Sequence, residues 1–571
     1  MAVGDYQVVG TNAKALFTLK VHRGEGMALL AMNWKTGKPD KDFVGFAIEY
    51  KEPKGIKFFA LKNRLTFDWV DVKKDPSVLQ TTRSPIQKFR WVHFPRNAEL
   101  EGEFRYRVTP MFMNAARELS AGEPQEVGIA LARETYPGKL NVAFTRGFVS
   151  SQAFVDRYES DGATIEQLLP AKAKDGLRFK PTHPKTDQAL AWMGFEARKA
   201  ILEVLDQGIA DETAAVRVAA YDLSEPEVVG KLKQIGARLK IVIDDEGDHG
   251  KTGSGEAQAA TLLRKAGAKV VRQHMGKLQH NKTIVVDGKV KKVVCGSTNF
   301  AWRGFFVQSN NAVVLTGAKS VKLFSEAFDS YFDDGTVAGF GKSTAATWND
   351  LGLAGIDARV TFSPHSKANA ALAEIADDID KQTTSSLLYS LAFLYQTDGP
   401  IKDAIVKHTK GTNVFVYGMS DKKVGGIELQ TPDGNVAPVA PAELTDGSTP
   451  EPFKSEPLGG SGIRLHHKFV VVDFDKPTAR VYLGSYNFSG VADQKNGENL
   501  LLIKDRRIAT SYAIEALRIF DHYEFRVNQR DAKKALEKLT LQAPPAKTGD
   551  KAWFEEDWSD ARKKHDRELF A

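Results

Sequence analysis

The sequence predicts a mixed α/β protein in which a β-sandwich precedes two similar α/β repeats. Short β-like segments dominate up to about residue 135, helical and strand-like segments alternate after residue 150, and that alternation occurs twice. A succession of helices and strands of this kind is typical of a parallel or mixed sheet covered by helices. We therefore expect three domains, at residues 1–140, 150–350 and 351–571.

The composition is that of a folded protein with a mild preference for anionic partners. Apolar residues make up 42% and charged residues 26% of the 571 positions, which is ordinary for globular proteins and excludes a disordered or fibrous chain. A domain averages roughly 150 residues, so three or four units are expected. The formal net charge is +7, and a basic surface favours polyanions.

Targeting signals and cysteines indicate the compartment. The first 17 residues show neither a basic n-region nor an apolar h-region, and no stretch approaches the ~20 apolar residues of a membrane span. Because Cys295 is the only cysteine, no internal disulfide and no thiolate metal cluster can form. We expect a cytoplasmic protein without a transmembrane segment, although export by a signal-less route would leave the same sequence.

The N-terminal region predicts a sandwich of short strands. Apolar and polar residues alternate between turn-rich spacers in six segments, at residues 27–34, 42–51, 56–61, 89–94, 103–113 and 125–131. A strand with Trp34, a strand ending in Ile48-x-Tyr50 and a later Tyr106-x-Val108 strand together resemble a fibronectin type III domain. That resemblance implies an accessory module, and a possible protein-docking role for residues 1–140.

The region after residue 150 predicts alternating helices and buried strands. Helical periodicity covers residues 186–207 and 256–267, and the strand-like runs VRVAAY and RLKIVIDD lie between them. A second series follows, with a helix at residues 371–380, an apolar run at residues 386–395 and a strand at residues 412–418. This return of the same order predicts an internal duplication.

Two segments carry the duplication most clearly. QHNKTIVVDGKVKKVVCGSTNF begins at Gln279 and LHHKFVVVDFDKPTARVYLGSYNF begins at Leu465. Each has the pattern His-x-Lys-x4-Asp followed by Gly-Ser-x-Asn, and each is followed by a strand and then a helix. The matching residues are His280, Lys282, Asp287, Ser297 and Asn299 in the first copy, and His466, Lys468, Asp473, Ser485 and Asn487 in the second.

These residue types suit phosphodiester chemistry. Because side chains alternate along a strand, His280 and Lys282 share one face, and so do His466 and Lys468. Histidine can act as nucleophile or acid near neutral pH, whereas Lys and Asn supply charge and hydrogen-bond donors for phosphoryl oxygens. This set requires neither a metal nor a cofactor. One chain carries both copies, so a monomer is sufficient for a complete site.

The paired motifs resemble those of the phospholipase D superfamily over residues 150–571. The resemblance implies two α/β/α repeats packed about a pseudo-twofold axis, with one histidine forming a phosphohistidine and the other acting as acid and then base. It also implies that Lys282, Lys468, Asn299 and Asn487 hold the phosphoryl oxygens, with Ser297 and Ser485 supporting them, and that Asp287 and Asp473 orient their neighbours.

A later glutamate in many members of the superfamily positions a catalytic histidine. Its counterpart here is Glu498 in the segment NGEN, whereas the aligned residue of the first repeat, in QSNN, is Asn310. The two halves of the site are therefore expected to differ, and the sequence leaves open which histidine attacks.

Several other residues have less specific patterns. His467 should point to the opposite strand face from His466, and His365-Ser366-Lys367 lacks the following Asp because Leu372 stands in its place. We interpret both histidines as structural, and Cys295 as a small buried hydrophobe.

Two further segments stay open at the level of sequence. The cluster Asp244, Asp245, Glu246, Asp248 and His249 follows a buried strand and could bind a divalent metal, but solvated or capping carboxylates are more common there. The Gly- and Pro-rich segment at residues 425–462 is either a linker or a loop at the rim of the active site, and we favour the rim.

Three classes of function remain: a nuclease, a phospholipase or phosphatidyltransferase, and a binding protein that docks through its N-terminal domain. Intact His and Lys pairs argue against the third. The motifs continue as GSTNFAWRG and GSYNFSGVA, without the Arg-Ser typical of lipid-acting branches. Phe300 and Phe488 after the Asn, and the segments QSNNAVV and KNGENLLLI, resemble the nuclease branch. We expect nucleic acid rather than phospholipid as substrate, in line with the basic charge.

Overall fold

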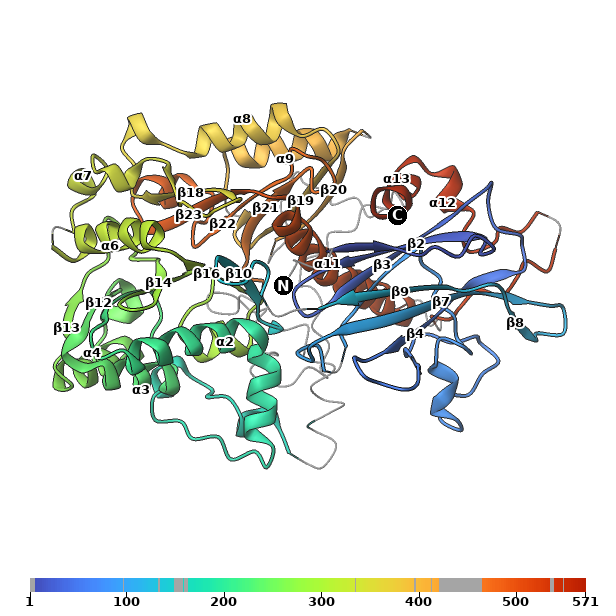
Figure 1. The fold of residues 1–571 in the computed structure, drawn as a ribbon, viewed down its shortest axis with the longest axis horizontal. Helices are drawn as coiled ribbons and strands as arrows, with labels where there is room; N and C mark the ends of the chain where they lie inside the picture. The colour runs from blue at the N-terminus through green and yellow to red at the C-terminus, as the bar shows by residue number, and fades with distance from the viewer. Residues whose placement is uncertain are drawn as a thin grey trace. The chain divides into compact units, whose positions relative to one another are not determined.

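The computed structural model describes residues 6–95, 97–131, 134–147, 158, 163–333, 335–394, 397–411, 413–420, 465–534, 539–547 and 549–571, without the side chains of 523–534. The contacts divide these residues into two compact units (Figure 1). Unit 1 combines residues 1–133 with residues 510–571, and unit 2 consists of the described residues between 134 and 509.

Unit 1 contains two antiparallel sheets. The first has the order β1-β2-β3-β6, made by Gln7–Val9, Phe17–Arg23, Ala28–Trp34 and Arg90–His93. The second has the order β5-β4-β7-β8, made by Phe59–Ala60, Phe43–Lys51, Glu103–Met113 and Leu119–Ala121, and β9 (Gln125–Ala130) pairs with β7. The sequence predicted β3, β4, β6, β7 and β9 closely, but β1 and β2 were not predicted.

One apolar core joins the two sheets. Alternate residues of β7 are buried, so that Phe104, Tyr106 and Val108 face inward, as the period of two along a strand requires. They pack in the same cluster as Phe17 from β2 and Phe46 from β4, whose rings lie 5.1 Å apart. Two sheets that share a core in this way form a β-sandwich. That architecture is also found in fibronectin type III domains, and the fibronectin resemblance itself stays a prediction.

The C-terminal residues complete this core. Phe554 is fully buried, and its ring lies 5.9 Å from that of Phe43. Trp553 stacks on Phe89, and its indole N–H donates a hydrogen bond to the carbonyl oxygen of Phe43. Helices α12 (Glu556–Ser559) and α13 (Ala561–Phe570) follow. The domain predicted at residues 351–571 did not anticipate the packing of residues 552–570 with the N-terminal strands. Such a contact joins residues far apart in the chain, so no local pattern in the sequence reveals it.

Unit 2 contains two seven-stranded sheets. The first has the order β10-β16-β15-β14-β11-β12-β13, made by Leu140–Phe144, Asn311–Thr316, Lys291–Gly296, Lys282–Asp287, Ala215–Ala220, Leu239–Ile243 and Lys269–Arg272. The second has the order β17-β18-β23-β22-β21-β19-β20, made by Asn349–Asp350, Asp357–Ser363, Glu498–Lys504, Arg480–Gly484, Lys468–Val472, Ser386–Leu391 and Phe415–Met419.

The two sheets are built alike, which confirms the predicted duplication of an α/β unit. The motif strand lies at the centre of each, with β14 between β15 and β11 and β21 between β22 and β19. The next strand in the chain pairs antiparallel with one side of each motif strand. On its other side in the sheet lies β11 or β19, which continues the sheet through a parallel pair, β11–β12 or β19–β20. Residues of β14 and β21 are almost entirely buried, as expected for strands covered on both faces.

Helices cover both faces of the first sheet. Phe328 of α6 (Ala318–Asp333) packs with Ala219 of β11, while Gly208 of α2 (Thr186–Ala210) approaches Val216 of the same strand. Positions 216 and 219 lie on opposite faces of the strand because side chains alternate, and Figure 1 shows the sheet between these helices. The predicted helices and layers are therefore confirmed for this repeat.

The remaining helices begin where the sequence supplies caps. Pro226 opens α3 (Pro226–Ile235), and the side chains of Glu225 and Ser254 cap α3 and α4 (Gly255–Lys265). Other helices of unit 2 are α5 (Trp302–Phe306), α7 (Val337–Phe340), α8 (Leu372–Gln382), α9 (Pro400–Lys410) and α10 (Gly490–Gln494), and α11 (Arg506–Lys534) runs from unit 2 into unit 1. Among the described residues, none of the helices combines the length and apolarity of a membrane span.

We predict that Phe554→Ala destabilises unit 1 by about 3–5 kcal/mol, because it removes a fully buried ring from the core. Hydrogen–deuterium exchange should show lost protection in β2 and β4 and unchanged protection in β14 and β21. Ile56→Ala, at a side chain that is 97% exposed, is the control and should change neither. Unchanged protection in β2 and β4 would show that the C-terminal residues do not stabilise this core.

Candidate active site

The two motif histidines lie close together in unit 2. His280 and His466 are 3% and 4% exposed, and their ring centroids are 6.4 Å apart. Each histidine precedes a central strand, which begins at the lysine two residues further on. The fold thus brings the two histidines of the paired motifs together, and their role in catalysis stays a prediction.

The contacts around the histidines are exchanged between the repeats. Gln279, just before His280, forms a parallel bridge with Gly497 of the second repeat. Leu465, just before His466, forms the matching bridge with Ser309 of the first repeat. Equivalent residues therefore make equivalent contacts in the two directions, which is the pattern of a pseudo-twofold axis.

Each histidine is held by a side chain from the other repeat. Nδ1 of His280 lies 2.9 Å from a carboxylate oxygen of Glu498, and Nδ1 of His466 lies 2.8 Å from Oδ1 of Asn310. Both acceptors require a proton on Nδ1, so Nε2 is the nitrogen that faces the site in each ring. The positions are equivalent but the chemistry differs, because one partner is an anion and the other a neutral amide.

The two lysines are placed in the same way. The ammonium groups of Lys282 and Lys468 donate to the carbonyl oxygens of His280 and His466, and the Lys468 bond measures 2.8 Å. Lys282 also lies 4.7 Å from the ring centroid of Tyr221, and Lys468 lies 5.6 Å from that of Phe393. Aromatic faces stabilise cations, so both ammonium groups have an environment that partly offsets their burial.

Burial lowers the pKa of all four motif side chains. Loss of hydration is the largest cause, and it lowers the pKa of Lys282 to about 7 even though Glu498 acts in the opposite direction. The pKa of Lys468 and that of His466 are also lowered, by burial and then by neighbouring lysines. Protonation of all these groups together is therefore unfavourable without a nearby anion. A bound phosphodiester would stabilise the charged lysines.

The glycine of each Gly-Ser-x-Asn segment is required by a close backbone contact. Gly296 and Gly484 have φ angles of +123° and +148°. A Cβ atom there would lie 2.6 Å from the carbonyl oxygen of Asn311 and 2.2 Å from that of Asn499. Only glycine fits such a position. The motif glycines therefore let two strands approach closely beside the histidines.

The motif serines act within the scaffold. Ser297 donates a 3.0 Å hydrogen bond to Oδ1 of Asn310, the partner of His466. It also accepts from the main-chain N–H of Asn311, and Ser485 accepts in the same way from Asn499. Ser297 thus orients a residue that orients a histidine, and its predicted support of the phosphoryl-oxygen contacts stays a prediction.

The motif asparagines differ between the repeats. Asn299 is buried and donates through Nδ2 to a carboxylate oxygen of Asp222, whereas Asn487 is half-buried and has no counterpart of that carboxylate among the described residues. Oδ1 of each asparagine is buried without a hydrogen-bond partner in the described part of the chain.

The motif aspartates lie away from the histidine rings, and the two make different contacts. Asp287, at the far end of β14, forms an ion pair with Lys291 and is partly exposed. Asp473 is fully buried and accepts hydrogen bonds from the backbone N–H groups of Thr384, Ser385 and Ser386. Asp473 thus holds the start of β19, whereas Asp287 pairs with Lys291, four residues further along the chain.

The residues interpreted as structural lie in structural surroundings. Both ring nitrogens of His365 are engaged, by Thr361 Oγ1 and an Asp493 oxygen, each at 2.8 Å. His467 is fully buried and packs edge-on against the rings of Phe144 and Phe469. Cys295 is also buried, and burial raises the pKa of its thiol. Phe300 and Phe488, next to the motif asparagines, are also buried in the core. Their position gives them no direct contact surface for a substrate.

Sequence reasoning missed Asp222 and Tyr221, which the fold brings to the site. Tyr221 packs edge-on against His280, with ring centroids 4.7 Å apart, and Asp222 binds both Asn299 and His249. The available signal was weak: a Tyr-Asp pair directly after the buried strand β11. Asp222, His249 and Glu256 offer ligand atoms within 4.8 Å of one another, a spacing that suits a metal ion.

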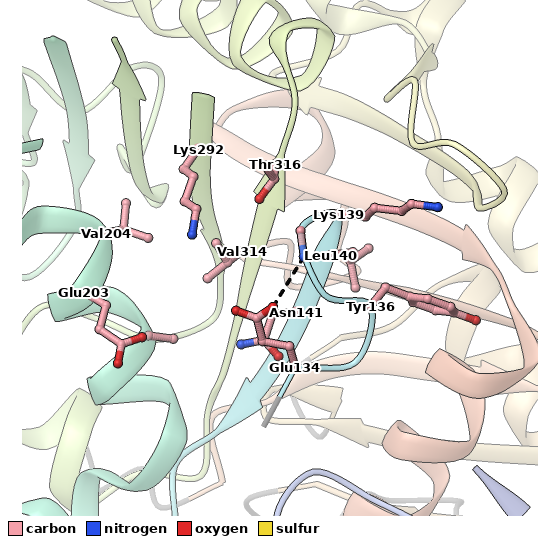
Figure 2. Close-up of a pocket in the computed structure, with 12 residues that line it drawn as sticks. Glu134, Tyr136, Lys139, Leu140, Asn141, Glu203, Val204, Lys292, Val314 and Thr316 are labelled. Atoms are coloured by element: carbon pink, nitrogen blue, oxygen red, sulfur yellow. Dashed lines mark hydrogen bonds between the residues drawn. The ribbon is translucent and has the colours of Figure 1, made fainter. Parts of the chain in front are cut away.

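Two other features lie apart from the histidines. The Gly- and Pro-rich segment at residues 425–462 falls outside the described residues, so its predicted place at the rim stays a prediction. Figure 2 shows a pocket of the first repeat between α2 and the sheet, lined by side chains that include Glu203, Lys292 and Thr316. None of the motif residues lines it.

We predict that Lys468→Met raises the melting temperature of the ligand-free protein at pH 7. The pKa of buried Lys468 lies below its unfolded value of about 10.4, so folding is opposed below that pH and Met removes the cost. A gain of about 1 kcal/mol corresponds to roughly 2–4 °C, and the gain should vanish as the pH approaches ~10. Lys251→Met, at an exposed lysine, is the control for thermal unfolding. A lower melting temperature at pH 7 would contradict the prediction.

Comparisons with known proteins match this arrangement. A family model described as "Cardiolipin synthase, PLD-like domain" matches residues 207–332 and 381–520. The phospholipase D of Rickettsia felis is 43% identical over 47 residues, which are 8% of this chain and 22% of that protein. That of Rickettsia prowazekii is 45% identical over 47 residues, 8% of this chain and 21% of the relative. The chain thus spans about a fifth of the length of these curated relatives.

Two solved structures are also similar to parts of this chain. Phosphatidylserine synthase from Haemophilus influenzae is 14% identical, with a TM-score of 0.40 over 60% of this chain and 92% of its own. Nuc from Salmonella typhimurium, described as a phospholipase D family member, is 29% identical, with a TM-score of 0.20 over 24% of this chain and 85% of its own. Residues 207–332 and 381–520, which carry the paired motifs on two similar sheets, are thus similar to the PLD-like domain of that family model.

Proposed function

We propose that the chain cleaves phosphodiester bonds through a phosphohistidine intermediate. The observation that carries this proposal is the pair of buried histidines, with rings 6.4 Å apart and each Nδ1 bound by the opposite repeat. Two lysines beside them supply fixed positive charge for the phosphoryl oxygens. A nucleophile, an acid and charge stabilisation are together what the reaction needs.

His280 is the proposed nucleophile. Its Nδ1–H donates to the Glu498 carboxylate, so the Nε2 lone pair is available and the positive charge that develops on the ring meets an anion. Nε2 attacks phosphorus, a P–N bond forms, and the P–O bond to the leaving group breaks. This assignment depends on the difference between Glu498 and Asn310, since a neutral amide stabilises an imidazolium less.

His466 is the proposed acid and base. Its Nε2–H gives a proton to the leaving oxygen in the first step, and the neutral ring then takes a proton from water, which attacks phosphorus and breaks the P–N bond. The pKa of His466 is lowered in the empty site by burial and by the nearby lysines. A phosphodiester anion counteracts that effect, so the substrate itself helps to protonate the acid.

Nucleic acid is the substrate class we favour. The absence of Arg-Ser after both Gly-Ser-x-Asn segments, the resemblance of their continuations to the nuclease branch, and the net charge of +7 support it. Because Phe300 and Phe488 are buried, the branch resemblance is one of sequence and not of base stacking. Cleavage with weak base preference is expected when phosphate contacts dominate binding.

Phospholipid headgroups are the alternative. The description of the matching family model and the names of the Rickettsia relatives favour it. The histidines and lysines serve either substrate equally, because both contain the same phosphodiester. For residues 1–140 we propose the fibronectin-like docking role, and for the chain the cytoplasmic location, that the sequence predicts.

We predict that His280→Ala and His466→Ala each reduce turnover of nucleic acid at least ~10²-fold, because the two steps need both rings. They should differ on bis(4-nitrophenyl) phosphate, whose leaving group needs little acid. His466→Ala should release one equivalent of nitrophenol in a burst and retain an adduct on His280 that peptide mass spectrometry detects. His280→Ala should give no burst.

His274→Gln, at a partly exposed histidine outside the motifs, is the control and should keep full activity. An adduct on His466 in the His280→Ala protein, with no adduct on His280 in the other variant, would reverse the assignment. Near-normal turnover by either alanine variant would contradict the shared site.

We further predict that single-stranded DNA, duplex DNA or RNA is cleaved at low salt in the presence of EDTA. Cleavage should fall steeply as salt rises, because phosphate contacts release counterions. Phosphatidylcholine micelles are assayed in parallel for released headgroup. Headgroup release without nucleic acid cleavage would establish the lipid alternative, and loss in EDTA with recovery in Mg²⁺ or Zn²⁺ would indicate a metal at Asp222, His249 and Glu256.

A further inference from the structure

Two carboxylates follow adjacent parallel strands of the first repeat. Asp222 comes two residues after β11, and Asp244 directly follows β12, which pairs with β11 in parallel. Their strands end at the same edge of the sheet, the edge where β14 begins and His280 lies. The fold therefore brings both carboxylates to the active-site end of the sheet.

His249 links the two carboxylates. It lies in a 3₁₀ turn, Gly247–Gly250, and its Nε2 and Nδ1 are each 2.9 Å from a carboxylate oxygen, of Asp222 and Asp244 respectively. Two acceptors require a proton on both nitrogens, so the ring is a cation. Burial lowers its pKa, but the hydrogen bonds to Asp222 and Asp244 outweigh this and raise the pKa to about 10.

The outer oxygens of this Asp–His–Asp bridge reach the catalytic motifs. Asp222 accepts from Nδ2 of Asn299 through its second oxygen. Asp244 accepts, at 2.7 Å, from the main-chain N–H of Gln279, which directly precedes His280. Between the two ends, the ring of Tyr221 packs against His249 and His280, with centroids 4.6 and 4.7 Å away. The bridge therefore touches both motif segments of the first repeat.

The second repeat has no such bridge among the described residues. The backbone follows the same path at the corresponding point of both repeats. The N–H group of Tyr221 donates to the carbonyl oxygen of Asn281, and that of Ala392 donates to the carbonyl oxygen of His467. The residue after Ala392 is Phe393, in place of Asp222, and the residue after β20 is Ser420, in place of Asp244. A bridge present on one side only is not a requirement of the fold that the repeats share.

We propose that Asp222, His249 and Asp244 form a positioning network that orients Asn299 and His280 toward the phosphodiester and sets the charge of the first half of the site. This inference rests on the proposed function. It goes beyond the paired motifs, because none of the three residues belongs to them. They act through Asn299 and the backbone of Gln279, so they are positioning residues and not catalytic ones.

The charged surroundings determine the pH effect. Burial lowers the pKa of Lys282, whereas the charges of Glu498, Asp222 and Asp244 each raise it. Glu256 lies beside His249 and Asp222, Lys468 adds positive charge from the other repeat, and Arg272 donates to the carbonyl oxygens of Asp244 and His249. Removing the Asp222 charge therefore makes protonated Lys282 less stable, whereas removing the His249 charge makes it more stable.

The test compares D222N, D244N and H249Q with the wild-type chain on bis(4-nitrophenyl) phosphate across pH 5–9. Each variant should lose roughly 10- to 100-fold in kcat with little change in KM, because misplacement affects the transition state most. The basic limb of the pH profile should move to lower pH in D222N and to higher pH in H249Q. D245N, at the neighbouring partly exposed aspartate that pairs with His274, is the matched control.

An equal loss of kcat at every pH, or a change in KM alone, would overturn the proposed network. Residues with a purely structural role would not shift the pKa values that shape the pH profile. NMR of labelled histidines gives a readout that does not depend on turnover. His249 should stay protonated above pH 9 in the wild-type chain, and D222N and D244N, but not D245N, should shift the His280 signals. Titration of His249 near its ordinary pKa would overturn the proposal, as would one equivalent of Zn²⁺ bound by the wild-type chain and lost in H249Q. Wild-type inactivity on every phosphodiester, with the NMR result intact, would overturn only the proposed function.

Discussion

The exchange of histidine partners between the two repeats is the contact on which the site depends. Glu498 holds His280 and Asn310 holds His466, so neither ring is oriented until the repeats have packed together. The parallel bridges on either side, at Gln279–Gly497 and Leu465–Ser309, fix the same interface through the backbone. Because the partners are separated by more than a hundred residues, the site forms only with the complete module, and both repeats must keep their sheets in register to build it.

This interface concentrates buried charge at a cost to stability. Two lysines and two histidines lie within one largely desolvated region, and burial lowers the pKa of all four. Such a group is destabilising on its own, and under the proposed function the same imbalance favours binding of a phosphodiester anion. A loss of stability at a site that stabilises a transition state is common in enzymes, and the proposed function would account for it here.

Duplication supplies the symmetry, and a few substitutions break it in a consistent direction. Glu498 acts on His280, and the Asp222–His249–Asp244 bridge lies on the same side of the site. The other side has Asn310, Phe393 and Ser420 at the corresponding positions. Negative charge is therefore gathered around one histidine, which is what a nucleophile that becomes cationic requires, whereas a proton donor benefits from a neutral partner.

Local pattern was sufficient for most of the sandwich strands, although not β1 and β2, and for the predicted helices and the two motif copies, because strand alternation, helical periodicity and Gly-Ser-x-Asn are properties of neighbouring residues. The resemblance to a known superfamily also predicted that Glu498 and Asn310 make the two halves of the site unequal. Tertiary structure alone decided the rest. The crossed partners of His280 and His466, the approach of Asp222 to Asn299, and the packing of Phe554 with Phe43 join residues far apart in the chain. Such contacts depend on which strand ends meet at one sheet edge, and no local signal encodes that meeting.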